Sequence, residues 1–211
     1  MDKIPGNLIV LSAPSGAGKT SLVHAVIDRL ERVSSSVSHT TRARRPNEVD
    51  GEDYFFVSTS EFEHMIARGD FIEHAEVFGN LYGTSQSEIQ KMLDNGIDLL
   101  LEIDWQGARS IRQSHPRARS IFILPPSNAA LRKRLLGRAG DDPDVIENRM
   151  QAAASEMSHY DEYEFLLIND DFERTLGEFC LIIQACRLST DSQRARFTST
   201  LDELMASAVT I

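Results

Sequence analysis

The segment from Asn7 to Leu30 constrains the fold of this chain more than any other part of the sequence. It begins with the apolar run Asn7–Leu11, which is typical of a strand buried on both faces. A Gly-rich loop follows, and after it apolar side chains recur at three- and four-residue spacing, which predicts an amphipathic helix. A strand, a Gly-rich loop and a helix in this order are the context that a phosphate-binding loop requires.

The loop meets the consensus G-x-x-x-x-G-K-[ST] except at its first position, where Ala13 replaces glycine. In such loops consecutive backbone N–H groups and the positive end of the helix hold phosphate oxygens. Lys19 is expected to reach the β- and γ-phosphates, and the Thr20 hydroxyl is expected to contact Mg²⁺. The motif predicts a bound nucleoside triphosphate but leaves the reaction open. The expected phosphate-loop contacts are Ala13, Pro14, Ser15, Gly16, Ala17, Gly18, Lys19 and Thr20.

Composition and charge exclude several classes of protein. The 211 residues are 41% hydrophobic and 26% charged, which argues against a disordered chain, a collagen or a coiled coil. The net charge of −10 argues against non-specific nucleic-acid binding. The apolar runs are far shorter than the roughly 20 residues that span a bilayer. No signal-peptide pattern and only two cysteines predict a cytoplasmic protein without a membrane or nucleic-acid partner. Its oligomeric state stays open.

Strands and helices alternate through most of the chain, which predicts an α/β fold with a parallel sheet. The segment 37–87 differs, because it combines a polar, Arg-rich loop with short strands, a hairpin and a helix that Ser60 is expected to cap and that runs to about Arg68. Ser85 and Glu88 form a capping-box pattern at its end, which predicts a helix to about Asn95. The later expected strands cover 97–103, 120–124 and 165–168, and the expected helices cover 105–115, 127–136, 143–160 and 172–188.

Motifs spread over nearly the whole chain resemble the guanylate kinase family, and closely its bacterial members. They are Ser12-Ala-Pro-Ser-Gly-Ala-Gly-Lys19, Ser36-Val-Ser-His-Thr-Thr-Arg42, Arg45-Pro-Asn-Glu-x-x-Gly-x-x-Tyr-x-Phe56, Phe71-Ile-Glu-His-Ala-Glu76, Gly79-Asn-x-Tyr-Gly-Thr84, Ile103-Asp-Trp-Gln-Gly107, Phe122-Ile-Leu-Pro-Pro126 and Asn169-Asp-Asp171.

The resemblance implies a P-loop nucleoside monophosphate kinase fold, in which helices flank a parallel sheet core. The chain is then a single domain, 1–211, that phosphorylates GMP, and with it dGMP, at the expense of ATP. The implied core is about 1–36, 88–128 and 158–190. A GMP-binding lobe covers about 37–87, a helical lid about 129–157 and a C-terminal tail 191–211.

The resemblance also assigns the acceptor site. A nucleotide monophosphate is dianionic near neutral pH, because its second pKa is about 6, and forked arginines and hydroxyl donors suit it. Guanine presents two donors on one edge, which a carboxylate can accept together. The residues implied for the GMP phosphate are Ser38, Arg42, Arg45 and Tyr54, and those implied for guanine are Glu73, Asp104, Tyr82 and Thr84.

The same resemblance places Lys19 with the lid arginines Arg134, Arg138 and Arg149 around the triphosphate, as the catalytic set. Asn169 stands where the family contacts the ATP base, and Glu102 could position Mg²⁺ through water. A general base is not needed, because the attacking phosphate oxygen is already ionised. Alignment and charge stabilisation are therefore the expected sources of rate.

Two alternatives remain open from the sequence. A kinase for AMP or UMP would use the same chemistry, although Glu73 and Asp104 argue against it. Guanylate-kinase-like modules that hold phosphopeptides without catalysis are of another class, and they typically lose parts of the phosphate loop or lid. Lys19, Thr20, Arg138 and Arg149 are all present here, which favours an enzyme.

Overall fold

The computed structural model of the chain describes residues 5–77, 79–136 and 143–208. The strands are β1 Leu8–Ser12, β2 Val33–Ser35, β3 His39–Thr40, β4 Phe55–Phe56, β5 Phe71–Val77, β6 Asn80–Ser85, β7 Asp98–Glu102, β8 Arg119–Leu124 and β9 Phe165–Ile168. The helices are α1 Lys19–Arg29, α2 Thr59–Arg68, α3 Gln86–Asp94, α4 Trp105–Ser114, α5 Asn128–Leu136, α6 Pro143–Met157, α7 Phe172–Arg187, α8 Thr190–Arg196 and α9 Thr198–Ala208, with a short 3₁₀ turn at Tyr160–Glu162.

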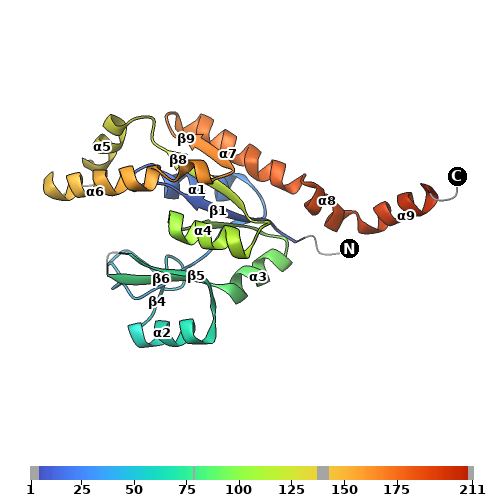
Figure 1. Ribbon diagram of the computed structural model, residues 1–211, viewed down its shortest axis with the longest axis horizontal. Coiled ribbons are helices and arrows are strands. Elements are labelled where there is room, and N and C mark those ends of the chain that lie inside the picture. Colours follow the sequence, from blue (N-terminus) through green and yellow to red (C-terminus); the bar gives the residue numbers. More distant parts are fainter. Residues whose placement is uncertain (1–4, 78, 137–142, 209–211) are drawn as a thin grey trace.

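A five-stranded parallel sheet of order β2-β7-β1-β8-β9 forms the core, with helices on both faces (Figure 1). Strand β1 lies in its middle, and all five of its residues are buried. Alternate side chains of a strand point to opposite faces. Ile9 and Leu11 therefore pack with α1 and α7, whereas Leu8 and Val10 pack with α3 and α4. The predicted buried strand before the phosphate loop is confirmed.

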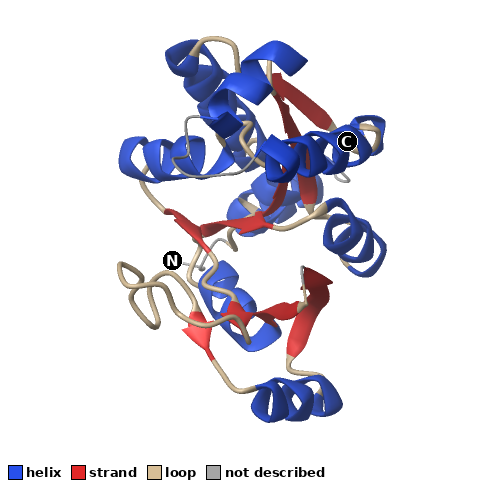
Figure 2. Ribbon diagram, turned by 90° about the vertical axis from the view of Figure 1, so that its left-hand side faces the viewer, coloured by secondary structure: helices blue, strands red, loops and turns tan. Residues whose placement is uncertain are grey.

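The segment predicted as a separate lobe forms a second sheet of order β4-β3-β6-β5, with α2 at its far end (Figure 2). Strands β5 and β6 form the predicted antiparallel hairpin, in which Glu73 pairs with Thr84. Phe62 of α2 is fully buried and stacks on Phe71 of β5 with ring centroids 4.5 Å apart. This aromatic contact fastens the helix to the hairpin.

Helices α5 and α6 form a layer of their own beside the core sheet (Figure 1). Leu131 and Leu135 of α5 are fully buried and pack with Ala153 of α6. Residues 137–142, which separate the two helices predicted at 127–136 and 143–160, lie outside the described residues. The proposed division into core, lobe and lid, with the boundaries given above, stays a prediction about which parts move together.

Several predicted helix ends need correction. Helix α2 is capped by the Ser58 hydroxyl, which accepts from the Glu61 N–H at 3.2 Å, and not by Ser60, which lies inside the first turn. Ser85 stands at the N-cap of α3 but makes no capping bond, because its hydroxyl contacts the Ser87 hydroxyl instead. Helix α6 ends at Met157, three residues before the predicted end.

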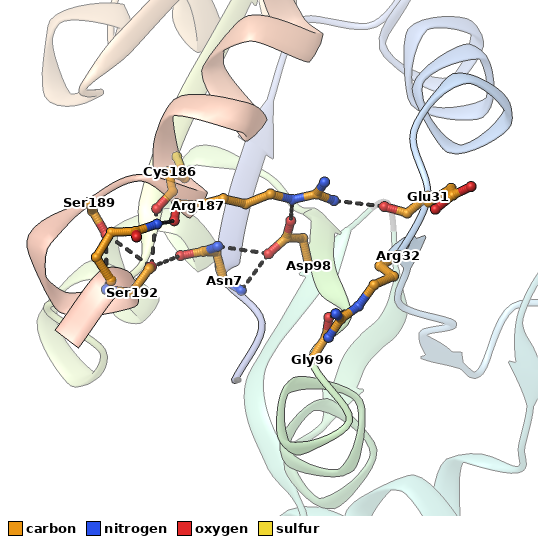
Figure 3. A network of polar contacts seen from close by, with 10 residues as sticks. Asn7, Glu31, Arg32, Gly96, Asp98, Cys186, Arg187, Ser189 and Ser192 are labelled. Carbon is orange, nitrogen blue, oxygen red and sulfur yellow. Dashed lines mark hydrogen bonds and ion pairs between the residues drawn. The ribbon is translucent and has the colours of Figure 1, made fainter. Parts of the chain in front are cut away.

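The C-terminal tail continues as α8 and α9, which extend away from the sheet (Figure 1). A polar network at the amino end of the sheet attaches α7 and α8 to the core (Figure 3). Its centre is Asp98, with a side chain only 3% exposed. Its carboxylate accepts from the Asn7 backbone and side-chain N–H groups, both at 2.7 Å, and from Arg187 Nε at 2.6 Å. None of the described helices combines the length and apolar character needed to cross a bilayer.

We expect Asp98→Ala to lower the free energy of unfolding by about 3 kcal/mol, because it leaves two Asn7 donors and the Arg187 guanidinium without their shared acceptor. Urea unfolding of the two proteins measures the difference. Asp94→Ala, which removes an exposed carboxylate in the same region, is the control and should change stability by less than about 0.5 kcal/mol. Equal effects of the two substitutions would contradict this role of Asp98.

Candidate functional site

A cleft of about 450 Å³ opens where the carboxyl ends of β1 and β7 face the lobe sheet. This is the edge at which parallel sheets bind ligands. The predicted site residues that line it are Ala13, Pro14, Ser15, Gly16, Gly18, Lys19, Thr20, Ser38, Tyr54, Glu73, Tyr82, Glu102 and Asp104. The predicted site residues that are described but do not line it are Ala17, Arg42, Arg45, Thr84, Arg134, Arg149 and Asn169.

The phosphate loop turns from β1 into α1 as the sequence predicts. Gly16 and Gly18 have φ values of +90° and +97°, a backbone conformation that side chains with a Cβ rarely adopt. Helix α5 packs against the back of this turn, because a Cβ on Gly16 would lie 3.1 Å from both Leu131 and Leu135. The loop is therefore held in shape by its own glycines and by a neighbouring helix.

Lys19 points its ammonium group into a part of the cleft that is rich in carboxylates. Burial lowers the pKa of Lys19, and Glu102, Glu156 and Asp104 oppose that shift through their negative charges. The lysine is a compact cation that a bound polyphosphate could share with these carboxylates. Lys19 thus places a positive charge, with three carboxylates near it, where the loop motif predicts phosphate.

Glu156 is a cleft residue that the sequence reasoning missed. It comes from α6, and its carboxylate is hydrogen-bonded to the Ser15 backbone of the phosphate loop. Burial raises the pKa of Glu156, whereas nearby Lys19 lowers it. The apolar stripe Ile146, Met150, Ala153 and Met157 marks the inner face of the helix and could have indicated that the adjacent Glu156 also points inward.

Thr20 and Glu102 bring two oxygen ligands together beside Lys19. The Thr20 hydroxyl donates to Glu102 Oε2 at 3.4 Å, from the first turn of α1 to the end of β7. Hydroxyl and carboxylate oxygens suit Mg²⁺, which usually keeps several waters and takes further ligands from substrate phosphates. The described residues contain no cluster of three or more His, Cys, Asp or Glu side chains arranged for a metal. This donor set fits a metal that arrives with a nucleotide.

Two carboxylates meet in the lobe side of the cleft. Glu73 is 8% exposed, and its Oε1 accepts from the Thr84 hydroxyl on the paired strand at 2.6 Å. Asp104 caps α4 by accepting from the Gly107 N–H at 2.8 Å. A Cβ on Gly107 would lie 3.1 Å from Glu73 Oε2 and 3.4 Å from Asp104 Oδ1. Both carboxylates therefore lie close to Gly107, and both residues line the cleft.

The predicted anion site for the acceptor phosphate is only partly assembled in the cleft. Ser38 and Tyr54 line the cavity, and the Ser38 hydroxyl lies 3.3 Å from that of Thr84. Arg42 lies one layer back, with its guanidinium 5.4 Å from the Tyr54 ring centroid. It donates to Glu48 at 2.6 Å, and the far more exposed Arg45 lies 3.9 Å from the same carboxylate. Glu48 thus pairs with both predicted phosphate ligands, and its single negative charge offsets part of their positive charge.

The other residues predicted to contact ATP do not line the cleft or fall outside the described residues. Arg134 donates to the backbone oxygens of Ala17 and Asn169, at 3.0 and 2.8 Å. The Asn169 side chain also donates to the Ala17 oxygen, at 2.7 Å. Arg149 lies on α6, and Arg138 falls outside the described residues. Their roles stay predictions.

Comparison with known proteins gives a consistent answer. The family model described as guanylate kinase matches residues 5–186. The guanylate kinase of Pseudomonas syringae pv. tomato is 55% identical over 214 residues, covering 98% of this chain and all of that protein. That of Alkalilimnicola ehrlichii is 55% identical over 202 residues, covering 96% and 100%. The crystal structure of guanylate kinase from Anaplasma phagocytophilum superposes with a TM-score of 0.72 at 35% identity, covering 92% and 97%.

The buried Glu73 makes stability depend on pH. Burial raises the pKa of Glu73 to about 7 from the usual 4.5, Thr84 opposes the shift, and Asp104 adds to it. The folded state holds this proton more tightly than the unfolded state, so ionisation removes stability as the pH rises from about 4.5 to about 7. Below that window Glu73 is neutral in both states and contributes no such loss.

We therefore expect Glu73→Gln to stabilise the protein more at pH 8 than at pH 5, by up to about 3 kcal/mol, since Gln carries no charge but still accepts from Thr84. Urea unfolding at both pH values, with the same urea series on the exposed-site variant Glu63→Gln, measures this difference. The same gain at both pH values would contradict a raised pKa.

Proposed function

The chain belongs to the guanylate kinase family and transfers a phosphoryl group from ATP to GMP; we propose that this transfer takes place in the cleft between the two sheets. One observation carries the assignment of the site. The same cavity joins a phosphate loop, at Lys19 and Thr20, to a pair of carboxylates, Glu73 and Asp104. A donor triphosphate and an acceptor base can then lie in one enclosed space, with the transferred group between them.

We propose that Glu73 and Asp104 recognise the guanine base. The imino N–H and the exocyclic amine of guanine are adjacent donors, which match two carboxylates that converge near Gly107. Adenine would place a lone pair at the imino position and meet repulsion. The Thr84 hydroxyl holds Glu73, and Tyr82 closes the same wall of the cleft. This arrangement supports GMP and dGMP, which share the base, over AMP or UMP.

We propose that Ser38, Tyr54, Arg42 and Arg45 hold the acceptor phosphate. The first two already face the cavity, and Arg42 lies against the Tyr54 ring. A dianionic phosphate would compete with Glu48 for the two guanidinium groups, because it carries more charge and offers forked acceptors. The attacking atom is an ionised phosphate oxygen, so the site needs no general base.

On the donor side, the loop backbone and Lys19 are proposed to hold the triphosphate, and Arg138 and Arg149 to gather around the transferred group. Mg²⁺ is proposed to be held by Thr20, with Glu102 contacting it through water. When bound, it would neutralise charge on the β- and γ-phosphates. Helices α5 and α6 would exclude water on closure, which suppresses hydrolysis of ATP. We place this reaction in the cytoplasm.

The phosphopeptide-binding alternative is not favoured. A module without catalysis would not require Lys19 and Thr20 of the phosphate loop to share one cleft with Glu73 and Asp104. The family relatives of comparable length are guanylate kinases over essentially their whole sequence.

We expect ADP formation to require GMP, ATP and Mg²⁺ together. A coupled assay with GMP, dGMP, AMP and UMP as acceptors tests this, and turnover should fall by at least about a hundredfold for AMP, because an adenine lone pair would face a buried carboxylate. Equal turnover of GMP and AMP would remove the guanine assignment. No turnover of any monophosphate would instead support the binding module.

We also expect Glu73→Gln to lower kcat/KM for GMP by roughly tenfold to a hundredfold while leaving the KM for ATP nearly unchanged, since the amide presents a donor to guanine's donors. Steady-state kinetics with each substrate varied in turn measures both values. Glu76→Gln, in the same strand, is the matched control. Full GMP efficiency in Glu73→Gln would mean that Glu73 has only a structural role.

A further inference from the structure

The Ala17–Gly18 peptide of the phosphate loop is held from behind by two side chains. Ala17 is fully buried, and its carbonyl oxygen accepts from Asn169 Nδ2 at 2.7 Å and from Arg134 Nη1 at 3.0 Å. Gly18, on the other side of the same peptide bond, lines the cleft, whereas Ala17 does not. The peptide therefore separates a buried side, with the carbonyl, from an open side.

The orientation of this peptide decides what a phosphate meets. No peptide bond in the described residues is cis, so the C=O of Ala17 and the N–H of Gly18 point in opposite directions. With the carbonyl held toward β9 and α5, the Gly18 N–H points away from them. If the peptide turned over, a carbonyl oxygen would face the phosphate in place of a donor, and the loop would repel the anion.

Asn169 is built into this position. It follows β9, where its backbone N–H donates to the Leu124 oxygen at 2.8 Å, and the residue is only 4% exposed. Its amide packs directly on the loop, because a Cβ on Gly18 would lie 2.4 Å from Asn169 Nδ2. The Asn169 amide nitrogen is therefore already committed to the loop and is not a donor for a ligand.

Arg134 is the second side chain that holds the Ala17 carbonyl. It lies on α5 between Leu131 and Leu135, the two leucines that pack behind Gly16. One guanidinium nitrogen donates to Ala17 and the other donates to the Asn169 backbone oxygen at 2.8 Å. The arginine therefore ties the loop, the end of β9 and α5 to one another.

We propose that Asn169 and Arg134 are positioning residues of the phosphate loop, which hold the Ala17 carbonyl away from the cleft so that the Gly18 N–H faces the triphosphate. This assigns Asn169 a role in holding the phosphates, which it performs through the loop. The inference rests on the proposed use of ATP at this loop. It also means that Arg134 supports the triphosphate site before any lid movement.

The decisive experiment compares ATP with inorganic tripolyphosphate, which has the phosphates but no base. Asn169→Ala should weaken both ligands by the same factor, roughly tenfold, because the lost bond supports the loop that both contact. KM for ATP and the inhibition constant of tripolyphosphate against ATP give the two values. A loss for ATP alone, with tripolyphosphate unchanged, would overturn the proposal and assign Asn169 to the base.

Two variants separate positioning from folding. Thr175→Ala removes a buried hydroxyl that bonds the Ile168 and Asp171 oxygens of the same corner, without touching the loop. It should lower thermal stability but leave tripolyphosphate inhibition unchanged; an equal loss of inhibition would overturn the proposal.

Asn169→Asp keeps the shape of the side chain but sets a carboxylate against the Ala17 carbonyl. Its loss of tripolyphosphate affinity should therefore exceed that of Asn169→Ala. A smaller loss would contradict the proposed hydrogen bond to the Ala17 carbonyl.

Arg134 and Asn169 donate to the same acceptor, the Ala17 carbonyl oxygen, so a double variant tests whether they act together. Arg134→Met and Asn169→Ala should not be additive, because both act on the Ala17 carbonyl. The double variant should lose clearly less tripolyphosphate affinity than the product of the two single losses. Strict additivity would overturn the joint role. A wild-type protein without GMP-dependent turnover would instead refute the proposed function, whatever these variants show.

Discussion

The structure depends on the requirement that a short stretch of backbone present its N–H groups to an anion while its carbonyls find partners elsewhere. A buried carbonyl without a donor is costly, and one turned toward phosphate would repel it. The loop between β1 and α1 meets this requirement through Gly16 and Gly18, whose positive φ values allow the turn. Its Ala17 carbonyl is satisfied by Asn169 and Arg134. The central strand, α5 and the end of β9 are thus all arranged around one turn.

Electrostatics shapes the cleft as strongly as the loop does. The protein carries a net charge of −10, yet its substrates are polyanions. Carboxylates that line the cleft serve separate purposes: Glu73 and Asp104 face the proposed base pocket, whereas Glu102 stands beside Thr20. Glu156 lies at the phosphate loop, with Lys19 nearby. An arriving triphosphate must outcompete that carboxylate, so the negative lining favours anions that come with a metal ion.

Some of the site was predictable because its residues carry a local signal. The phosphate loop follows a buried strand, and the structure places its lysine and threonine in the cleft. Glu73 interrupts the apolar run of β5, a pattern typical of a buried, partnered carboxylate, and it is 8% exposed beside Thr84. Other features depended on neighbours that no local pattern reveals. Ser85 fits a capping box but bonds Ser87, and Arg42 with Arg45 shares Glu48 instead of lining the cleft.

By itself, the sequence determined the parallel α/β core, the phosphate loop, the separate lobe and, through its motifs, the family. The core, the loop and the lobe elements follow from periodicity and spacing along the chain, which short-range sterics and burial of alternate side chains translate into strands, turns and helices, whereas the family follows from the resemblance of the motifs. Only the tertiary structure decided that Asn169 and Arg134 meet the carbonyl of Ala17, and that Glu156 reaches the loop from α6. These contacts join residues more than 100 positions apart, and a hydrogen bond depends on a few tenths of an ångström and on direction. Such geometry is set by how whole helices and strands pack, and not by the residues on either side of each donor.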